Sequence, residues 1–140
     1  MDCGLGRPLP AGVGIVTQWF GDRPAYYARW DLAGHNGLDY GVVVGTPVLS
    51  ALEGVVQRIG DDVAGYGLFV RVANGYMVSL YGHLSSILCQ VGDHVDVGQQ
   101  IGLSGNTGNS TGPHLHWGIR WVRGRNPAYG DWVDPAPLRV

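Results

Sequence analysis

Leu68-Phe-Val-Arg-Val-Ala-Asn-Gly-Tyr-Met-Val-Ser-Leu-Tyr81 is the stretch that best indicates the fold class of this chain. Two runs rich in β-branched and aromatic residues flank Asn74-Gly75, a dipeptide that tolerates the positive φ values of a type I′ turn. We therefore predict an antiparallel hairpin with strands at 68–72 and 76–81.

The segments on either side of this hairpin also read as short strands. Apolar runs at 14–20, 38–43, 48–51, 54–59 and 115–122 end at Gly, Pro, Asn or Asp, and 95–97 and 100–103 suggest another short pair around Gly98. No segment predicts a helix, whereas 23–34 and 104–113 read as loops and the tail from 123 as irregular. The expected fold class is mainly β, a small antiparallel, sandwich-like β-sheet with long loops.

The composition excludes several classes of protein. The 140 residues fit one domain, 1–140, with 24 glycines and 8 prolines for tight turns. The net charge of −2, the absence of Lys and the scatter of nine arginines along the sequence argue against a nucleic-acid partner. No apolar run is long enough to insert into a membrane. Cys3 and Cys89 leave both a disulfide and two free thiols open.

Three histidine settings suggest metal-binding or catalytic chemistry: His35 with Asp39, His114 with His116, and His83 at the end of the hairpin. His35 and Asp39 are residue types that zinc accepts, although a polar loop histidine and a turn aspartate would look the same. His114 and His116 are two apart in an expected strand, so they share one face while Leu115 takes the other. Two incidental histidines on an exposed strand remain the alternative.

The other two histidines carry weaker signals on their own. His83 follows Tyr81-Gly82 at the end of the hairpin, where a histidine is commonly structural or exposed, and His94 reads as an exposed turn residue. The polar loop 105–112 lacks the Lys and the following helix of a phosphate-binding loop, so it is better interpreted as the wall of a groove.

Together, these segments resemble the lysostaphin-type (LytM-type) zinc endopeptidases, peptidase family M twenty-three. The resemblance rests first on His35-Asn-Gly-Leu-Asp39, Tyr81-Gly-His83-Leu84 and Gly105-Asn-Thr-Gly-Asn-Ser-Thr-Gly-Pro-His114-Leu-His116. It covers roughly 12–138, the expected domain core. Further matches in the same order are Val16-Thr-Gln-Trp-Phe-Gly21, Gly45-Thr-Pro-Val48, Glu53-Gly54-Val55, Val91-Gly-Asp-His-Val95, Val97-Gly98, Ile101-Gly102 and Val133-Asp134-Pro135.

The resemblance implies one zinc ion per chain, held by His35, Asp39 and His116 in a groove over the sheet. It assigns His83 and His114 as the catalytic histidines. Water activated by zinc would be the nucleophile, and the two histidines would act as general acid, base and oxyanion stabilisers, because imidazole titrates near ~6.5.

The implied substrates are the stem and cross-bridge peptides of bacterial peptidoglycan. Their small side chains suit a narrow groove between loops 23–34 and 104–113, and we expect substrate contacts from Tyr26, Tyr27, Tyr81, Asn109 and Ser110. An inactive family member acting as a wall-binding or virion domain, and an amidase cutting the sugar-to-peptide bond, are the alternatives.

We further expect a monomer that acts on the bacterial cell wall. The sequence begins without a basic n-region and an apolar h-region, so the expected setting is holin-dependent release, a virion-associated domain or an excised domain.

Overall fold

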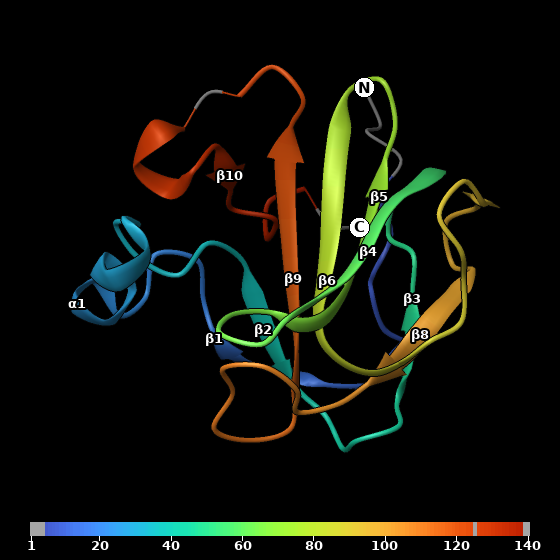
Figure 1. The fold of residues 1–140 in the computed structure, drawn as a ribbon, viewed down its shortest axis with the longest axis horizontal. Coiled ribbons are helices and arrows are strands. Elements are labelled where there is room, and N and C mark those ends of the chain that lie inside the picture. The colour runs from blue at the N-terminus through green and yellow to red at the C-terminus, as the bar shows by residue number, and fades with distance from the viewer. Residues whose placement is uncertain (1–4, 125, 139–140) are drawn as a thin grey trace.

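The computed structural model describes residues 5–124 and 126–138, and within them ten strands form one curved antiparallel sheet (Figure 1). Two short 3-10 helices accompany the single turn of α1, and no helix of the described residues is long and apolar enough to cross a membrane. The elements are β1 (Ile15–Gln18), α1 (Pro24–Tyr27), η1 (Ala28–Trp30), β2 (Leu38–Gly41), β3 (Pro47–Leu49), β4 (Gly54–Asp62), β5 (Gly67–Ala73), β6 (Met77–Ile87), β7 (His94–Val95), β8 (Gln100–Ser104), β9 (His114–Trp121), η2 (Pro127–Tyr129) and β10 (Trp132–Val133).

Strand β6 connects the two parts of the sheet. The main part has the order β1-β2-β9-β6-β5-β4-β7, with β10 on β9, whereas β8 and β3 extend the sheet from the far end of β6. Met77 to Gly82 pair with β9, and Leu84 to Ile87 pair with β8. His83 lies between these stretches with a left-handed φ of 61°, so the strand bends at this residue.

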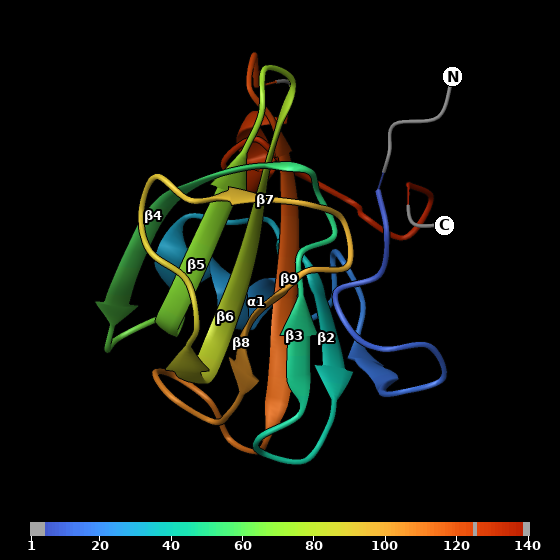
Figure 2. The same ribbon diagram turned by 90° about the vertical axis from the view of Figure 1, so that its right-hand side faces the viewer.

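The core lies between the main sheet and the β3–β8 pair. Figure 2 shows β3 and β8 in front of β6 and β9, with α1 behind them on the opposite face. Alternation along each strand sends one set of side chains into this core and the other set towards α1. The fully buried core side chains include Leu38, Tyr40, Val48, Leu52, Tyr81, Ile101, Leu115, Trp117 and Ile119.

The predicted fold class and the central hairpin are confirmed, but the turn is of another type. Neither Asn74 nor Gly75 has a positive φ, so type I′ geometry is absent there. Instead the backbone N–H of Asn74 donates to Met77 O, and Asn74 Oδ1 accepts from the N–H groups of Tyr76 and Met77. The asparagine therefore stabilises this turn through its side chain.

Three further expectations are corrected by tertiary pairing. The segments 95–97 and 100–103 do not pair with each other, because β7 pairs with β4 while β8 pairs with β3 and β6. The tail is not wholly irregular, since β10 pairs with β9. Loop 23–34 contains α1, in which Pro24 occupies the first turn, where its missing N–H costs nothing. Cys3 lies outside the described residues, and Cys89 is half-buried.

Candidate active site

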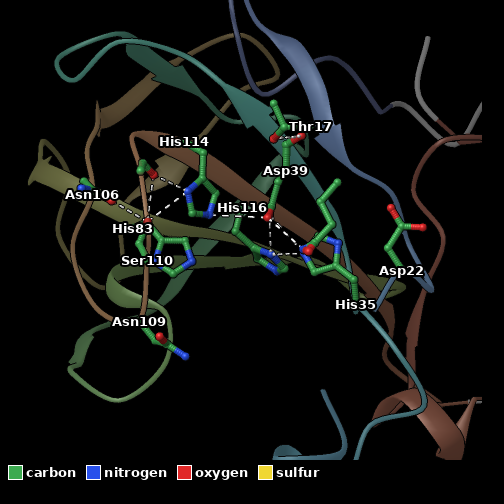
Figure 3. Close-up of polar contacts among 12 residues, drawn as sticks. Thr17, Asp22, His35, Asp39, His83, Asn106, Asn109, Ser110, His114 and His116 are labelled. Carbon is green, nitrogen blue, oxygen red and sulfur yellow. Dashed lines mark hydrogen bonds and ion pairs between the residues drawn. The ribbon is translucent and has the colours of Figure 1, made fainter. Parts of the chain in front are cut away.

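Three predicted ligands meet at one point on the α1 side of the sheet. His35 Nε2, Asp39 Oδ1 and His116 Nδ1 are mutually 3.1 Å apart, and all three residues are buried. Figure 3 shows their side chains pointing toward one another, with His83 and His114 beside them. The described residues thus bring together side chains separated by up to 81 positions in sequence.

Strand register explains why the ligands converge. Asp39 on β2 pairs directly with His116 on β9, so both side chains leave the same face of the sheet. His35 lies in the loop that enters β2, as predicted, and its backbone is held by Gly21 N–H and Asp22 O. A Cβ on Gly37 would lie 2.4 Å from Trp117 O and 2.7 Å from the His116 ring, so this loop passes His116 only because residue 37 is glycine.

The donor set fits a zinc ion. Ligands of a tetrahedral zinc with bonds of about 2.0–2.1 Å lie roughly 3.3 Å apart, close to the observed separations. His35 Nδ1 lies 3.1 Å from Trp19 O, and because a carbonyl only accepts, Nδ1 carries the proton and Nε2 presents a lone pair to the cluster. One carboxylate oxygen and two imidazole nitrogens that face one another form a set of ligands that a bound cation would stabilise.

The two predicted catalytic histidines sit side by side next to this cluster. The His83 and His114 ring centroids are 4.5 Å apart. His83 Nδ1 donates to Thr107 O at 2.7 Å, and His114 Nδ1 lies 2.8 Å from Gly112 O, so one loop fixes the tautomers of both rings. Their Nε2 atoms are therefore free of protons in the neutral rings, and His114 Nε2 lies 3.5 Å from Asp39 Oδ2.

Burial sets the protonation states of the cluster. Burial, together with the nearby rings of His116 and His114, lowers the pKa of His83 to about 4. Burial would raise the pKa of Asp39, but the hydrogen bond from His116 and the close approach of the His35 ring outweigh it and hold the pKa well below its usual range. The site therefore combines an ionised Asp39 carboxylate with a neutral His83 imidazole at neutral pH.

A pocket of about 630 Å³ opens over these residues. Both expected loop walls line it: Tyr26 and Tyr27 come from one loop, and Asn109 and Ser110 come from the other. Asn109 Nδ2 donates to Tyr26 Oη at 2.9 Å and so links the two walls. Ser110 Oγ lies 3.1 Å from His114 Nδ1, which places it against the His114 ring as well as in the pocket lining.

Tyr81 is the one predicted substrate contact that the structure places elsewhere. Its side chain is fully buried on the core face, where its hydroxyl contacts Ser79 Oγ at 2.7 Å and Ala51 N–H at 2.8 Å. Residues 81 and 83 would share a face in a regular strand, but the bend at His83 separates them. The expectation that Tyr81 contacts substrate is therefore wrong.

Sequence reasoning missed several residues of the site, above all Tyr66 and Gln18. The Tyr66 ring stacks at 5.2 Å on His116, and its hydroxyl accepts from Asn36 Nδ2 at 2.8 Å. Gln18 Nε2 donates to Tyr27 Oη at 2.8 Å and lies 3.5 Å from Asp39 Oδ2. The only available signals were a tyrosine between two glycines and a polar residue in an apolar strand, both of which are common outside active sites.

The sequence also matches the model of Peptidase family M23 over residues 33–135, more than half of the chain. Peptidoglycan DD-endopeptidase ShyA of Vibrio cholerae serotype O1 is 47% identical over 111 residues, which are 79% of this chain and 25% of that protein. The chain therefore belongs to peptidase family M23, and the resemblance seen in its motifs is confirmed.

Solved structures show the same fold. The antimicrobial peptidase lysostaphin from Staphylococcus simulans superposes with a TM-score of 0.75 at 31% identity, covering 89% of this chain and 48% of that chain. A zinc-containing peptidase from Vibrio cholerae gives a TM-score of 0.76 at 29% identity, covering 86% of this chain and 37% of that one. The chain spans between 18% and 26% of the length of the curated relatives ShyA, ShyB, ShyC and an uncharacterised Haemophilus influenzae metalloprotease.

Proposed function

We propose that this chain is a zinc-dependent endopeptidase that hydrolyses peptide cross-links of bacterial peptidoglycan. The observation that carries the proposal is the cluster of His35 Nε2, Asp39 Oδ1 and His116 Nδ1, which lie within 4.8 Å of one another at an open pocket. His83 and His114 stand beside it with unprotonated Nε2 atoms. Family membership and the name of the zinc-containing relative support the choice of metal.

The ligand set also accounts for the chemistry that the site can provide. When bound by His35, Asp39 and His116, one zinc ion supplies a Lewis acid that lowers the pKa of water towards ~7 and polarises a carbonyl group. The single carboxylate among the ligands leaves a net positive site, which favours negative charge developing on a carbonyl oxygen.

The two remaining histidines would handle the protons. Each has an unprotonated Nε2, because loop carbonyls of Thr107 and Gly112 hold the proton on Nδ1. Either ring can accept a proton from water and return it to the leaving amine, and the protonated ring can donate a hydrogen bond to an oxyanion. The ring separation of 4.5 Å allows both to reach one scissile bond.

The relatives favour one class of cross-link. ShyA, ShyC and ShyB are named peptidoglycan DD-endopeptidases, and the Neisseria meningitidis protein Mpg is named a DD-carboxypeptidase/endopeptidase. We therefore favour a D-alanyl bond to a diamino acid over a glycyl-glycine bridge. We also propose that residues 1–140 form one domain that works at the cell wall as a monomer, with Tyr26, Tyr27, Asn109 and Ser110 contacting the peptide.

Digestion of purified peptidoglycan, followed by mass spectrometry of the products, tests the proposal. We expect peptide-to-peptide bonds to break, the activity to disappear with a chelator, and added zinc to restore it. Release of peptides from sugar would instead indicate an amidase. Unchanged peptidoglycan with the zinc-loaded protein would indicate an inactive family member, and activity that is indifferent to chelation would contradict the zinc mechanism.

A further inference from the structure

Three arginines that lie far apart in sequence gather on the same face of the sheet as the active site. Arg58 on β4 pairs with Arg71 on β5, and Arg71 in turn pairs with Leu80 on β6. Leu80 pairs with Gly118 on β9. Gly118 lies midway between His116 and Arg120, and the three residues share one face because they are two positions apart. Arg58, Arg71 and Arg120, here called the arginine patch, therefore lie on the face of the sheet that carries the metal ligands, at some distance from them.

The arginine patch has no acidic partner among the described residues. None of its three members forms an ion pair with another described residue; Arg58 lies 5.6 Å from the centre of the Phe69 ring, and Arg120 lies 5.4 Å from that of Trp132. The Nε atoms of Arg71 and Arg120 are buried without a hydrogen-bond partner. Burial, together with the charges of Arg120 and Arg58, lowers the pKa of Arg71. Three like charges held together in this way repel one another.

The arginine patch is continuous with the catalytic pocket. Trp132, which packs under Arg120, lines that pocket, as does Tyr66. The charges of Arg71 and Arg120 act on Tyr66, which stacks on His116. Arg120 comes four positions after His116 on β9, a span of about 13 Å at 3.3 Å per residue. In Figure 1, β9 runs from the loop that precedes His114 towards β10.

We propose that Arg58, Arg71 and Arg120 form a subsite that binds a free carboxylate of the peptide substrate, with Arg120 about 13 Å along β9 from His116. This inference rests on the proposed function, since it gives the peptide an acidic group three or four residues from the bond that is cut. A planar guanidinium binds a carboxylate through two parallel hydrogen bonds, and the outer N–H groups of these side chains, which are exposed in Arg58 and half-buried in Arg71 and Arg120, can make them. A carboxylate bound there neutralises charge that the protein itself leaves unpaired.

The test compares two forms of one cross-linked peptide, with its stem carboxylates either free or amidated. The variants Arg71→Gln and Arg120→Gln are measured against Arg123→Gln, which removes an exposed arginine from outside the catalytic pocket. We expect the wild type and Arg123→Gln to prefer the acidic form, and each patch variant to lose about tenfold in that preference while its kcat/KM for the amidated form is unchanged.

The stability of the variants separates binding from a structural role. Removing one of three mutually repelling charges should leave the thermal midpoint unchanged or raise it. A lowered midpoint together with equal losses on both substrates would show that these arginines only support the fold. A wild type that cuts both forms equally would overturn the subsite and leave the proposed function intact. Failure to cut either form would overturn the proposed function, and arginine-dependent binding of the acidic peptide by calorimetry would then still support the subsite.

Discussion

Asn109 donates a hydrogen bond to the phenol oxygen of Tyr26 at 2.9 Å, joining two loops that are 83 residues apart in sequence and form opposite walls of the pocket. Arg23 and Arg29 each lie 4.3 Å from the Tyr26 ring, so the tyrosine is also held from within its own loop. The bond is exposed to solvent, and an exposed hydrogen bond contributes little net stability. It can therefore open at low cost when a polymer enters.

We predict that Asn109→Ala and Tyr26→Phe each raise the ratio of two cleavage rates, that on intact cell walls to that on a short soluble peptide, by about twofold. Both variants remove the hydrogen bond that joins the two loops of the pocket. The free energy of unfolding should change by about 1 kcal/mol or less. Rates on both substrates and urea unfolding check this. The double variant should show no further increase, and additive effects would mean that the two side chains act separately.

The ligand and catalytic histidines should separate experimentally. We predict that His116→Ala loses both zinc and activity, because a site with two ligands binds zinc weakly. His83→Gln and His114→Gln should lose activity by a factor of about 10² or more while retaining zinc. Metal analysis after dialysis, together with peptide hydrolysis, gives both quantities. Equal zinc loss in all three variants would contradict this division of roles.

Gly37 tests the close packing around His116. We predict that Gly37→Ala destabilises the protein by about 2 kcal/mol and weakens zinc binding, because the new methyl group meets Trp117 O and the His116 ring. The matched control is Gly75→Ala, where no atom lies within 4 Å of the new Cβ and φ is not positive. Thermal melts with and without zinc measure both effects, and similar losses in the two variants would refute the packing argument.

Buried His83 should make the metal-free protein sensitive to mild acid. Its pKa of about 4 lies below the ordinary value of 6.5, so between these pH values the unfolded chain binds a proton that the folded chain does not. Stability should therefore fall as the pH drops from 6.5 to 4, by about 3 kcal/mol in total from this residue.

Urea unfolding of the metal-free protein at a series of pH values measures this effect. We expect His83→Gln to flatten the dependence over that window. The control His94→Gln, which removes a side chain that is 60% exposed, should retain the wild-type slope. An unchanged slope in His83→Gln would show that other groups cause the acid sensitivity.

Local sequence signals specified most of the strands. The hairpin around Asn74-Gly75 and the alternation of His114, Leu115 and His116 depend on side chains within a few residues of one another. The hairpin strands were predicted, although the turn type was not, and the alternation was predicted with the correct facing. The ends of β6 and the partners of β7 and β8 were not predicted, because they depend on which distant strand supplies the hydrogen bonds. The bend at His83, which sends Tyr81 into the core, has the same origin.

The family motifs supplied the identities of the five central site residues, and the register of β2 on β9 brings Asp39 and His116 together. Tyr66 and the arginine patch lie outside these motifs, and Gln18 lies in the matched segment Val16-Thr-Gln-Trp-Phe-Gly21, to which no role was assigned. Their neighbours in space come from other strands and loops, so their local sequence contains no trace of the contacts that they make.

The sequence by itself determined the strand-forming segments, the turn residues and the chemical types of the ligands, since these follow from local backbone preference and side-chain chemistry. Only the tertiary structure decided that three scattered arginines share one face with the metal ligands, and that Tyr26 and Asn109 meet across the pocket. Contacts of this kind arise from the register and curvature of a whole sheet, which many weak interactions fix jointly and no short segment encodes.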